Sequence, residues 1–346
     1  MDLQAAGVHF VGSIPLEDAE EVFSSVARAL AGRVPRIPDG ETGKRSNWVV
    51  WQDQVFADSE SFEVVRSDLD EYAPIATYRL AATADLVSIG ELGYAAEAVS
   101  SYSVFERLKN DGVIPEGIRF QVSLPTPVAV LAAFVLAEDR FTIEPAYEDA
   151  LLSELVAIVE AIPQGELSIQ WDVAAEFGIL EGVDMPFFRD WWEEPMGPIS
   201  DRILRLGRAV PDGVELGYHL CYGDSGHKHF VQPDDAGLLV AIAQVLVEGL
   251  GEKLSLVHVP VPRDRKDRAY FAPLGDLALP PHTALYLGLI HATDGVDGAI
   301  ERIAAAREFV EGFGIATECG LGRRSGDSIQ QILHLHADVF DAYLRS

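Results

Sequence analysis

The stretch VELGYHLC, residues 214–221, decides how the chain is organised. It is a short run of β-branched, aromatic and aliphatic residues, typical of a buried strand, and it ends in His219 and Cys221. Seven more runs of this kind occur along the chain, each followed by Gly, Pro or polar residues. We expect these runs to be strands as well: residues 8–11, 34–37, 118–122, 167–170, 254–257, 284–290 and 314–317.

Helical patterns separate the strand-like runs. Residues 16–30 carry Asp and Glu in the first turn, which suits the helix dipole, and residues 146–162, 234–250 and 299–313 have apolar side chains at helical spacing. Alternating strands and helices predict βαβ units, and eight such units favour an α/β fold, a (β/α)8 TIM barrel with helical insertions. The alternative is a doubly wound open sheet, which more often carries a GxGxxG loop that this sequence lacks.

Two connections are too long for a simple barrel. Residues 53–117 are expected to hold extra helices, and residues 183–198 (VDMPFFRDWWEEPMGP) form an irregular insertion. No linker and no change of composition divides the chain, so we expect residues 1–346 to form one domain.

The composition excludes several classes of protein. The chain has 346 residues, with 26 Lys and Arg against 55 Asp and Glu, a net charge of −29. This balance argues against nucleic acid and membrane surfaces as partners. Two cysteines are too few for a disulfide scaffold. Without a targeting signal or a long apolar run, we expect a cytoplasmic protein with a small-molecule substrate, and a homo-oligomer stays open.

Polar residues follow the predicted strands at the end where the active site of such a barrel lies. Because a barrel interior is otherwise apolar, polar side chains grouped at its mouth indicate a functional site. The residues at these strand ends are Ser13, Asp39, Glu41, Asp172, His219, Cys221, His258, His291, Glu318 and Cys319.

Four of these residues predict a zinc site. His219 and Cys221 are two residues apart, so at a strand end both side chains point to the same side. Imidazole and thiolate are favoured zinc ligands. Cys319 ends a later strand and His258 ends an intervening one, so both are expected to converge on the pair. The alternative for a single free cysteine is a small buried apolar residue.

Two carboxylates follow other strands. Glu41 and Asp172 are predicted to bind a cation such as an amino group, or to transfer protons. The alternative is an ion pair with one of three nearby cations, Arg36, Lys44 or Arg45. His291 follows an apolar strand and is a general acid, a metal ligand or, as the more common case, a satisfied core histidine.

Other polar and aromatic residues are weaker candidates. His227 and His229 are expected to be exposed in a loop, and His334 and His336 to lie on a helix surface. Tryptophans are more often core residues than parts of a pocket. The chain has five of them: Trp48, Trp51, Trp171, Trp191 and Trp192. Arg323 and Arg324 are expected to bind an anion or to pair with surplus carboxylates.

These motifs resemble the C-terminal, catalytic barrel of cobalamin-independent methionine synthase, in the superfamily that also contains uroporphyrinogen decarboxylase. The resemblance runs from residue 8 to residue 324 and follows the family's order. The matching segments are GSIP at 12–15, GE at 40–41 with Arg45, the strand ending at Asp172, HLCY at 219–222, the strand ending at His291, and CGL at 319–321.

The resemblance implies roles for these residues. His219, Cys221 and Cys319 match zinc ligands that activate a thiol, and His258 stands where the family has a fourth ligand, a glutamate. His291 matches a histidine that assists methyl transfer. The residues that match those holding the amino acid part of homocysteine are Ser13, Glu41 and Asp172. Asp39 replaces the family's histidine before Gly-Glu, so the metal chemistry transfers better than the substrate.

The main hypothesis is therefore zinc-dependent methyl or alkyl transfer involving a thiol, by a methyltransferase or demethylase with His291 and Asp172 as catalytic residues. The resemblance implies an enzyme like 5-methyltetrahydrofolate–homocysteine methyltransferase and a methylated folate as a candidate co-substrate. The alternative is a zinc-dependent lyase or hydrolase acting on a small substrate, with an aromatic compound as a candidate. A zinc-stabilised binding protein and a metal-free decarboxylase stay open, although the decarboxylase needs more arginines at the mouth than this acidic chain offers.

Overall fold

A seven-stranded parallel sheet forms the centre of the fold. The computed structural model describes residues 6–69, 74–83, 86–223 and 228–346. The strands lie in the spatial order β1, β4, β5, β6, β7, β8, β9, and each overlaps a run expected from the sequence. Their bounds are β1 Arg36–Pro38, β4 Arg119–Pro125, β5 Leu167–Val173, β6 Glu215–Leu220, β7 Leu254–Pro260, β8 Ala284–Ile290 and β9 Gly314–Thr317.

Residues 8–13 occupy the eighth position and close the ring. Val8 bridges Ile315 of β9, and Ser13 bridges Gly40 directly after β1, both in parallel orientation. The fold is thus an α/β TIM-type barrel, as predicted. The segment is not a regular strand over residues 8–11, which differs from the expectation.

Side-chain amides explain why this segment lacks a regular ladder. The Nε2 atom of Gln121 lies 2.9 Å from the carbonyl oxygens of both Phe10 and Val11. Gln170 Nε2 lies 2.6 Å from the oxygen of Val11, and Ser123 donates to the same oxygen. Donors from side chains therefore satisfy carbonyls that backbone N–H groups would satisfy in a strand.

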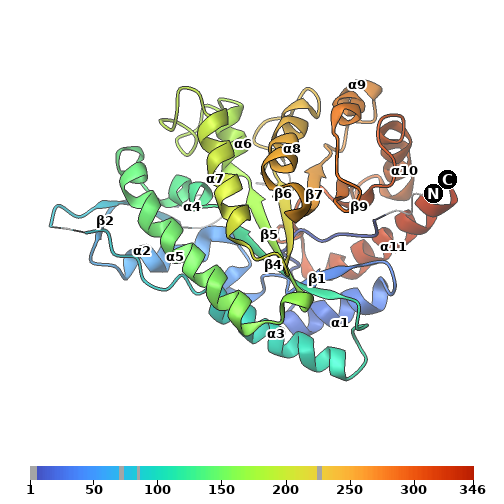
Figure 1. Ribbon diagram of the computed structural model, residues 1–346, viewed down its shortest axis with the longest axis horizontal. Coiled ribbons are helices and arrows are strands. Elements are labelled where there is room, and N and C mark those ends of the chain that lie inside the picture. The colour runs from blue at the N-terminus through green and yellow to red at the C-terminus, as the bar shows by residue number, and fades with distance from the viewer. Residues whose placement is uncertain (1–5, 70–73, 84–85, 224–227) are drawn as a thin grey trace.

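Helices surround the strands (Figure 1). In α1 the side chain of Asp18 caps the first turn, while Val22, Phe23 and Val26 face the core, as the acidic start and apolar spacing require. The other helices are α2 Asp53–Ala57, α3 Tyr94–Asn110, α4 Pro127–Phe134, α5 Arg140–Ala161, α6 Ala175–Leu180, α7 Met196–Ala209, α8 Gly237–Leu250, α9 Arg268–Phe271, α10 Gly295–Ala306 and α11 Ile329–Arg345, with α1 at Ala19–Ala29. Within the described residues, no helix is long and apolar enough to cross a bilayer.

The long insertion after β1 holds the expected helices, α2 and α3, and also an antiparallel hairpin that was not expected. The hairpin consists of β2 (Phe62–Leu69) and β3 (Pro74–Leu80) and lies at the edge of the molecule opposite the chain ends (Figure 1). Tyr78 ties it to the barrel, because its hydroxyl group donates to Asp53 and its carbonyl oxygen accepts from Leu136.

The irregular insertion between β5 and β6 is confirmed and is fastened by arginines. Arg140 donates to the carbonyl oxygen of Arg189 at 2.9 Å and stacks on Trp191, with 4.9 Å between the guanidinium carbon and the ring centre. Arg202 stacks on Trp192 in the same way at 4.5 Å. These two tryptophans therefore have the structural role that the sequence favoured.

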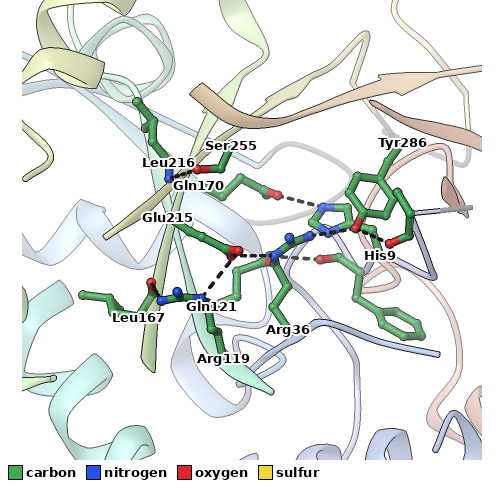
Figure 2. Close-up of polar contacts among 12 residues, drawn as sticks. His9, Arg36, Arg119, Gln121, Leu167, Gln170, Glu215, Leu216, Ser255 and Tyr286 are labelled. Atoms are coloured by element: carbon green, nitrogen blue, oxygen red, sulfur yellow. Dashed lines mark hydrogen bonds and ion pairs between the residues drawn. The ribbon is translucent and has the colours of Figure 1, made fainter. Parts of the chain in front are cut away.

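A polar network fills the end of the barrel where the strands begin (Figure 2). Arg36 has a side chain only 5% exposed; it donates to Glu215 at 3.1 Å and to the hydroxyl group of Tyr286 at 3.2 Å. Tyr286 in turn donates to the carbonyl oxygen of Ala6 at 2.8 Å, and Arg119 lies 3.5 Å from the other oxygen of Glu215. The network thus links β1, β4, β6 and β8 to the N-terminal segment.

Replacing Arg36 by methionine should cost about 2 kcal/mol of unfolding free energy, because Glu215 loses a charged hydrogen-bond donor that is itself almost fully buried. Arg119→Met is the matched control, because Arg119 contacts the same carboxylate from a site that is 29% exposed, and its loss should cost under about 1 kcal/mol. Urea denaturation of the three proteins measures both. Equal losses of unfolding free energy for the two variants would contradict this account of the polar network at the end of the barrel where the strands begin.

Candidate functional site

A cavity of about 220 Å³ opens where the strands end. It lies at the end of the barrel opposite the network of Arg36, as the fold class predicts. Its polar lining combines two carboxylic acids, one imidazole and two thiols, and its apolar lining includes Trp48 and Phe230. The predicted residues that line it are Ser13, Glu41, Asp172, His219, Cys221 and Cys319.

Three of these residues form a compact group of potential metal ligands. One ligand atom from each of His219, Cys221 and Cys319 lies within 4.8 Å of the other two. The two Sγ atoms are 3.6 Å apart, so no disulfide joins the two cysteines, and Cys319 Sγ lies 3.7 Å from Nε2 of His219. The group can therefore hold a metal ion, as the sequence predicted for these three residues.

The ends of two distant strands bring this group together. His219 is the penultimate residue of β6, and Cys221 follows the strand, where its N–H donates to the carbonyl oxygen of Val173 in β5. Cys319 follows β9, on the far side of β7 and β8. The backbone N–H of Gly223 donates to Cys221 Sγ, with 3.2 Å between the nitrogen and the sulfur.

His258 does not contribute an atom to this group. It is fully buried beside His219, with 2.7 Å between the two Nδ1 atoms, and its Nε2 atom lies 3.0 Å from the carbonyl oxygen of Thr317. Both nitrogens are thus engaged behind His219, which differs from the expectation that His258 is the fourth ligand. Burial lowers the pKa of His219 well below its usual value and lowers the pKa of His258 to about 4.

Glu41 and Asp172 face the cavity from two strand ends. The three cations that were alternative partners of Glu41 each pair with another carboxylate. Arg36 pairs with Glu215, Lys44 with Glu97, and Arg45 with Asp39 at 2.6 Å. Ser13 hydrogen-bonds to Glu41, and Gln170 donates to Asp172 at 2.9 Å.

Both carboxyl groups resist ionisation. Burial raises the pKa of Glu41 to about 7, against the opposing charge of Arg45. Burial and the neighbouring Glu41 raise the pKa of Asp172 well above its usual value, although Trp48 and Gln170 donate hydrogen bonds to it. A cationic group placed in the cavity would favour ionisation of both acids, and shifts of this kind are typical of functional sites.

Two residues of the cavity have strained backbones. Glu41 has φ of +50° and Trp48 has φ of +47°, in the left-handed region that favours glycine. The fold holds these side chains in place despite that cost, which points to a functional role. Phe230 was not predicted as a site residue. Trp48 was considered for an aromatic pocket but expected in the core, and the sequence offers no spacing that separates it from a core tryptophan.

His291 lies outside the cavity lining. It is buried, its Nε2 atom lies 2.9 Å from the carbonyl oxygen of Val261, and its Nδ1 atom lies 3.6 Å from Glu318. The other oxygen of Glu318 is 3.6 Å from Nε2 of His229. Glu318 therefore lies between two imidazoles, directly before Cys319, and the two imidazoles contribute to holding its pKa below the usual value.

Two expectations about other histidines are wrong. The side chain of His229 is only 3% exposed, because the loop folds inward against Tyr222, while His227 lies outside the described residues. His336 is fully buried against Phe10 and donates from Nδ1 to the carbonyl oxygen of Ile332 in its own helix, whereas His334 is exposed as expected. Arg323 lines the cavity and contacts Asn47.

Two solved structures share the fold over almost the whole chain. A putative vitamin-B12-independent methionine synthase from Listeria monocytogenes is 13% identical, with a TM-score of 0.56 over 98% of this chain and 99% of that one. A B12-independent methionine synthase from Shewanella sp. W3-18-1, in complex with selenomethionine, is 13% identical, with a TM-score of 0.57 over 99% and 98%. No protein-family model and no curated protein sequence matches the chain. The resemblance seen in the motifs is thus confirmed at the level of the fold.

Substitution of Glu41 by glutamine should stabilise the protein at alkaline pH. Between pH 4.5 and about 7 the unfolded chain loses the proton of Glu41 while the folded protein keeps it, so the free energy of unfolding falls as the pH rises. The glutamine variant lacks this loss and should be more stable than the parent at pH 8, by about 1–2 kcal/mol, but not at pH 4. Denaturation at both pH values measures the difference, and a gain of equal size at both would refute it.

Proposed function

We propose that the protein, acting as one barrel domain, is a zinc-dependent transferase that moves a methyl or related alkyl group to or from the sulfur of a small thiol. The observation that carries the proposal is the convergence of His219, Cys221 and Cys319 beside two substrate-facing carboxyl groups. The fold shared with two methionine synthases supports it.

The donor atoms fit zinc in type and in spacing. Zinc binds nitrogen and sulfur at about 2.1 and 2.3 Å, so a tetrahedral ion needs ligand atoms about 3.6–3.8 Å apart. In the structure the two sulfurs are 3.6 Å apart and Cys319 Sγ is 3.7 Å from Nε2 of His219, while the third pair of ligand atoms lies within 4.8 Å. Three protein ligands leave one position for a substrate, which is typical of catalytic sites. A bound zinc ion would supply the Lewis acidity that turns a thiol into a thiolate at neutral pH.

Glu41, Asp172 and Ser13 would bind and orient the substrate. Two carboxyl groups that ionise reluctantly by themselves form a good receptor for an ammonium group, because the cation removes the penalty of their charge. Ser13 is hydrogen-bonded to Glu41 and lines the cavity, so it can complete the polar side of the receptor. We therefore propose an amino thiol, such as an amino acid with a side-chain thiol, as one substrate.

Trp48 and Phe230 would exclude water from the reacting atoms. They form the apolar side of a cavity of about 220 Å³, which suits one small molecule. In this proposal the buried imidazole of His291 and the neighbouring carboxylate of Glu318 act together. They take up or release a proton near Cys319. The methyl donor would be a methylated small molecule, with a methylated folate as the first candidate.

A second candidate function keeps the metal and changes the reaction. A three-ligand site with an open position also suits a metal-bound water, as in zinc lyases and hydrolases. The aromatic walls of Trp48 and Phe230 favour this reading, with a small aromatic substrate. The two functions differ in one measurable property, because only the first requires the protein to bind a thiol.

Elemental analysis of the purified protein should find about one zinc per chain. The variants Cys221→Ser and Cys319→Ser should lose the metal while circular dichroism shows the barrel intact, because serine is a poor zinc ligand. Cys221 and Cys319 should already give the cobalt-substituted protein a sulfur-to-metal charge-transfer band, and titration with a thiol should increase and shift that band. Alkylation of homocysteine by methylated donors, including a methylated folate, tests turnover.

The outcomes separate the two candidates. Full activity in metal-free protein would refute both of them. Zinc that is retained without any response to thiols would reject the transferase and support the lyase or hydrolase. Zinc together with thiol binding and methyl transfer would establish the main proposal.

A further inference from the structure

His258 is the buried polar residue nearest the proposed metal ligands whose role is unexplained. It is in register with His219, because β6 and β7 pair these two residues directly across the sheet. Their ring centres are 4.8 Å apart, and the exposed fractions of His219 and His258 are 2% and 0%. The ring nitrogen of a metal-binding histidine that does not face the metal is usually held by a hydrogen-bonding partner, and a neighbouring imidazole can serve as that partner.

The hydrogen bond from His258 to β9 determines where its proton is. The Nε2 atom of His258 lies 3.0 Å from the carbonyl oxygen of Thr317, and a carbonyl oxygen only accepts. His258 must therefore carry its proton on Nε2. Because burial without a paired carboxylate disfavours an imidazolium, Nδ1 of the same ring is left with a lone pair.

The contact between the two imidazoles then determines the form of His219. The Nδ1 atoms are 2.7 Å apart, a distance that requires one N–H and one lone pair. Since His258 offers the lone pair, His219 must donate from Nδ1. The Nε2 atom of His219 is then unprotonated, and it is the atom that lies 3.7 Å from Cys319 Sγ. Its lone pair therefore faces the metal-binding group.

The absence of a side chain at Gly288 leaves space for the hydrogen bond between His258 and Thr317. A Cβ atom at position 288 would lie 2.6 Å from the Thr317 oxygen, 2.7 Å from the Cα atom of Glu318 and 3.0 Å from Nε2 of His258. A residue with a side chain at position 288 would thus be too close to both the Thr317 oxygen and Nε2 of His258, the two atoms of the hydrogen bond that orients His258. The glycine and the histidine form one local arrangement across β7, β8 and β9.

We propose that His258 is a positioning residue rather than a metal ligand, and that the relay from Thr317 through His258 holds His219 in the tautomer that presents Nε2 to the metal. Its effect on metal affinity rests on the proposed function, whereas the tautomers themselves do not. A histidine held by a second imidazole keeps its lone pair aimed at the metal, and partners of this kind are worth about 10–100-fold in metal affinity.

Nitrogen-15 NMR of the full-length protein with labelled histidines tests the relay directly. In metal-free protein we expect His219 to carry its proton on Nδ1 and His258 to carry its proton on Nε2. After loading with cadmium-113, coupling to the metal should appear for Nε2 of His219 and not for His258. The reverse tautomer at either residue, or metal coupling to His258, would overturn the proposal.

Variants supply a second, independent measurement. His258→Leu and Gly288→Ala should each weaken zinc binding about 10–100-fold in competition with a chelator. His258→Asn, which keeps an acceptor near the position of Nδ1, should recover part of the affinity. The matched control is His336→Leu, because His336 is also fully buried and bonded to a backbone carbonyl, of Ile332, but belongs to α11. It should leave zinc affinity unchanged.

These measurements distinguish two kinds of failure. If the parent protein binds no zinc but shows the expected tautomers, the proposed function fails and the relay stands. If the parent binds zinc and His258→Leu loses no more affinity than His336→Leu, the relay has no role in metal binding and the inference is refuted.

Discussion

Two buried glutamine amides hold the N-terminal segment in the barrel, and the geometry of the cavity depends on them. Gln121 and Gln170 both donate to the carbonyl oxygens of residues 10–11, where a regular strand would receive backbone N–H groups. Gln170 also donates to Asp172 and lies 2.9 Å from Nε2 of His9. The side-chain amide of Gln170 therefore contacts both the N-terminal segment that leads to Ser13 and the carboxyl group of Asp172. Gln121 is the side-chain donor to the Phe10 oxygen, and leaving that buried carbonyl unsatisfied would cost about 1–3 kcal/mol, whereas the Val11 oxygen accepts from Gln121, Gln170 and Ser123.

The same polar interior continues toward the potential metal ligands His219, Cys221 and Cys319. His9 stacks near Tyr286 and His258, with ring centres 4.9 and 5.6 Å apart. Figure 2 shows His9, Gln170 and Tyr286 together inside the barrel, above the pair of Arg36 and Glu215. A barrel interior is usually packed with branched apolar residues. Here directed hydrogen bonds replace part of that packing, so the orientation of the site's side chains is specified from within the core.

Much of this organisation was predictable from the sequence, because it follows from strand periodicity. The runs ending in His219 and near Cys319 are recognisable as strands, and a parallel barrel brings their ends together whatever their separation in the chain. The direction of His258 was not predictable, since it depends on the register between β6 and β7 and on a hydrogen bond to Thr317.

Other differences have equally local causes. The loop that carries His229 has the composition of an exposed segment, yet Glu318 and Tyr222 offer the imidazole a buried place. His336 lies at a position of α11 that faces Phe10, although polar residues usually face solvent. The two strands of the β2–β3 hairpin contain β-branched and aromatic residues, which favour strands. Residues 70–73, which connect them, lie outside the described residues.

The left-handed backbone at Glu41 and Trp48 lowers the stability of the protein in order to keep two side chains in the cavity. Glycine would relieve the strain at each position, which costs roughly 1–2 kcal/mol for a residue with a side chain. A search for heat-resistant variants would therefore select glycine at the two positions that supply the cavity with an acid and an indole. Selection for stability alone would thus remove two side chains that we propose to contact the substrate, so stabilising substitutions are better placed at the opposite end of the barrel.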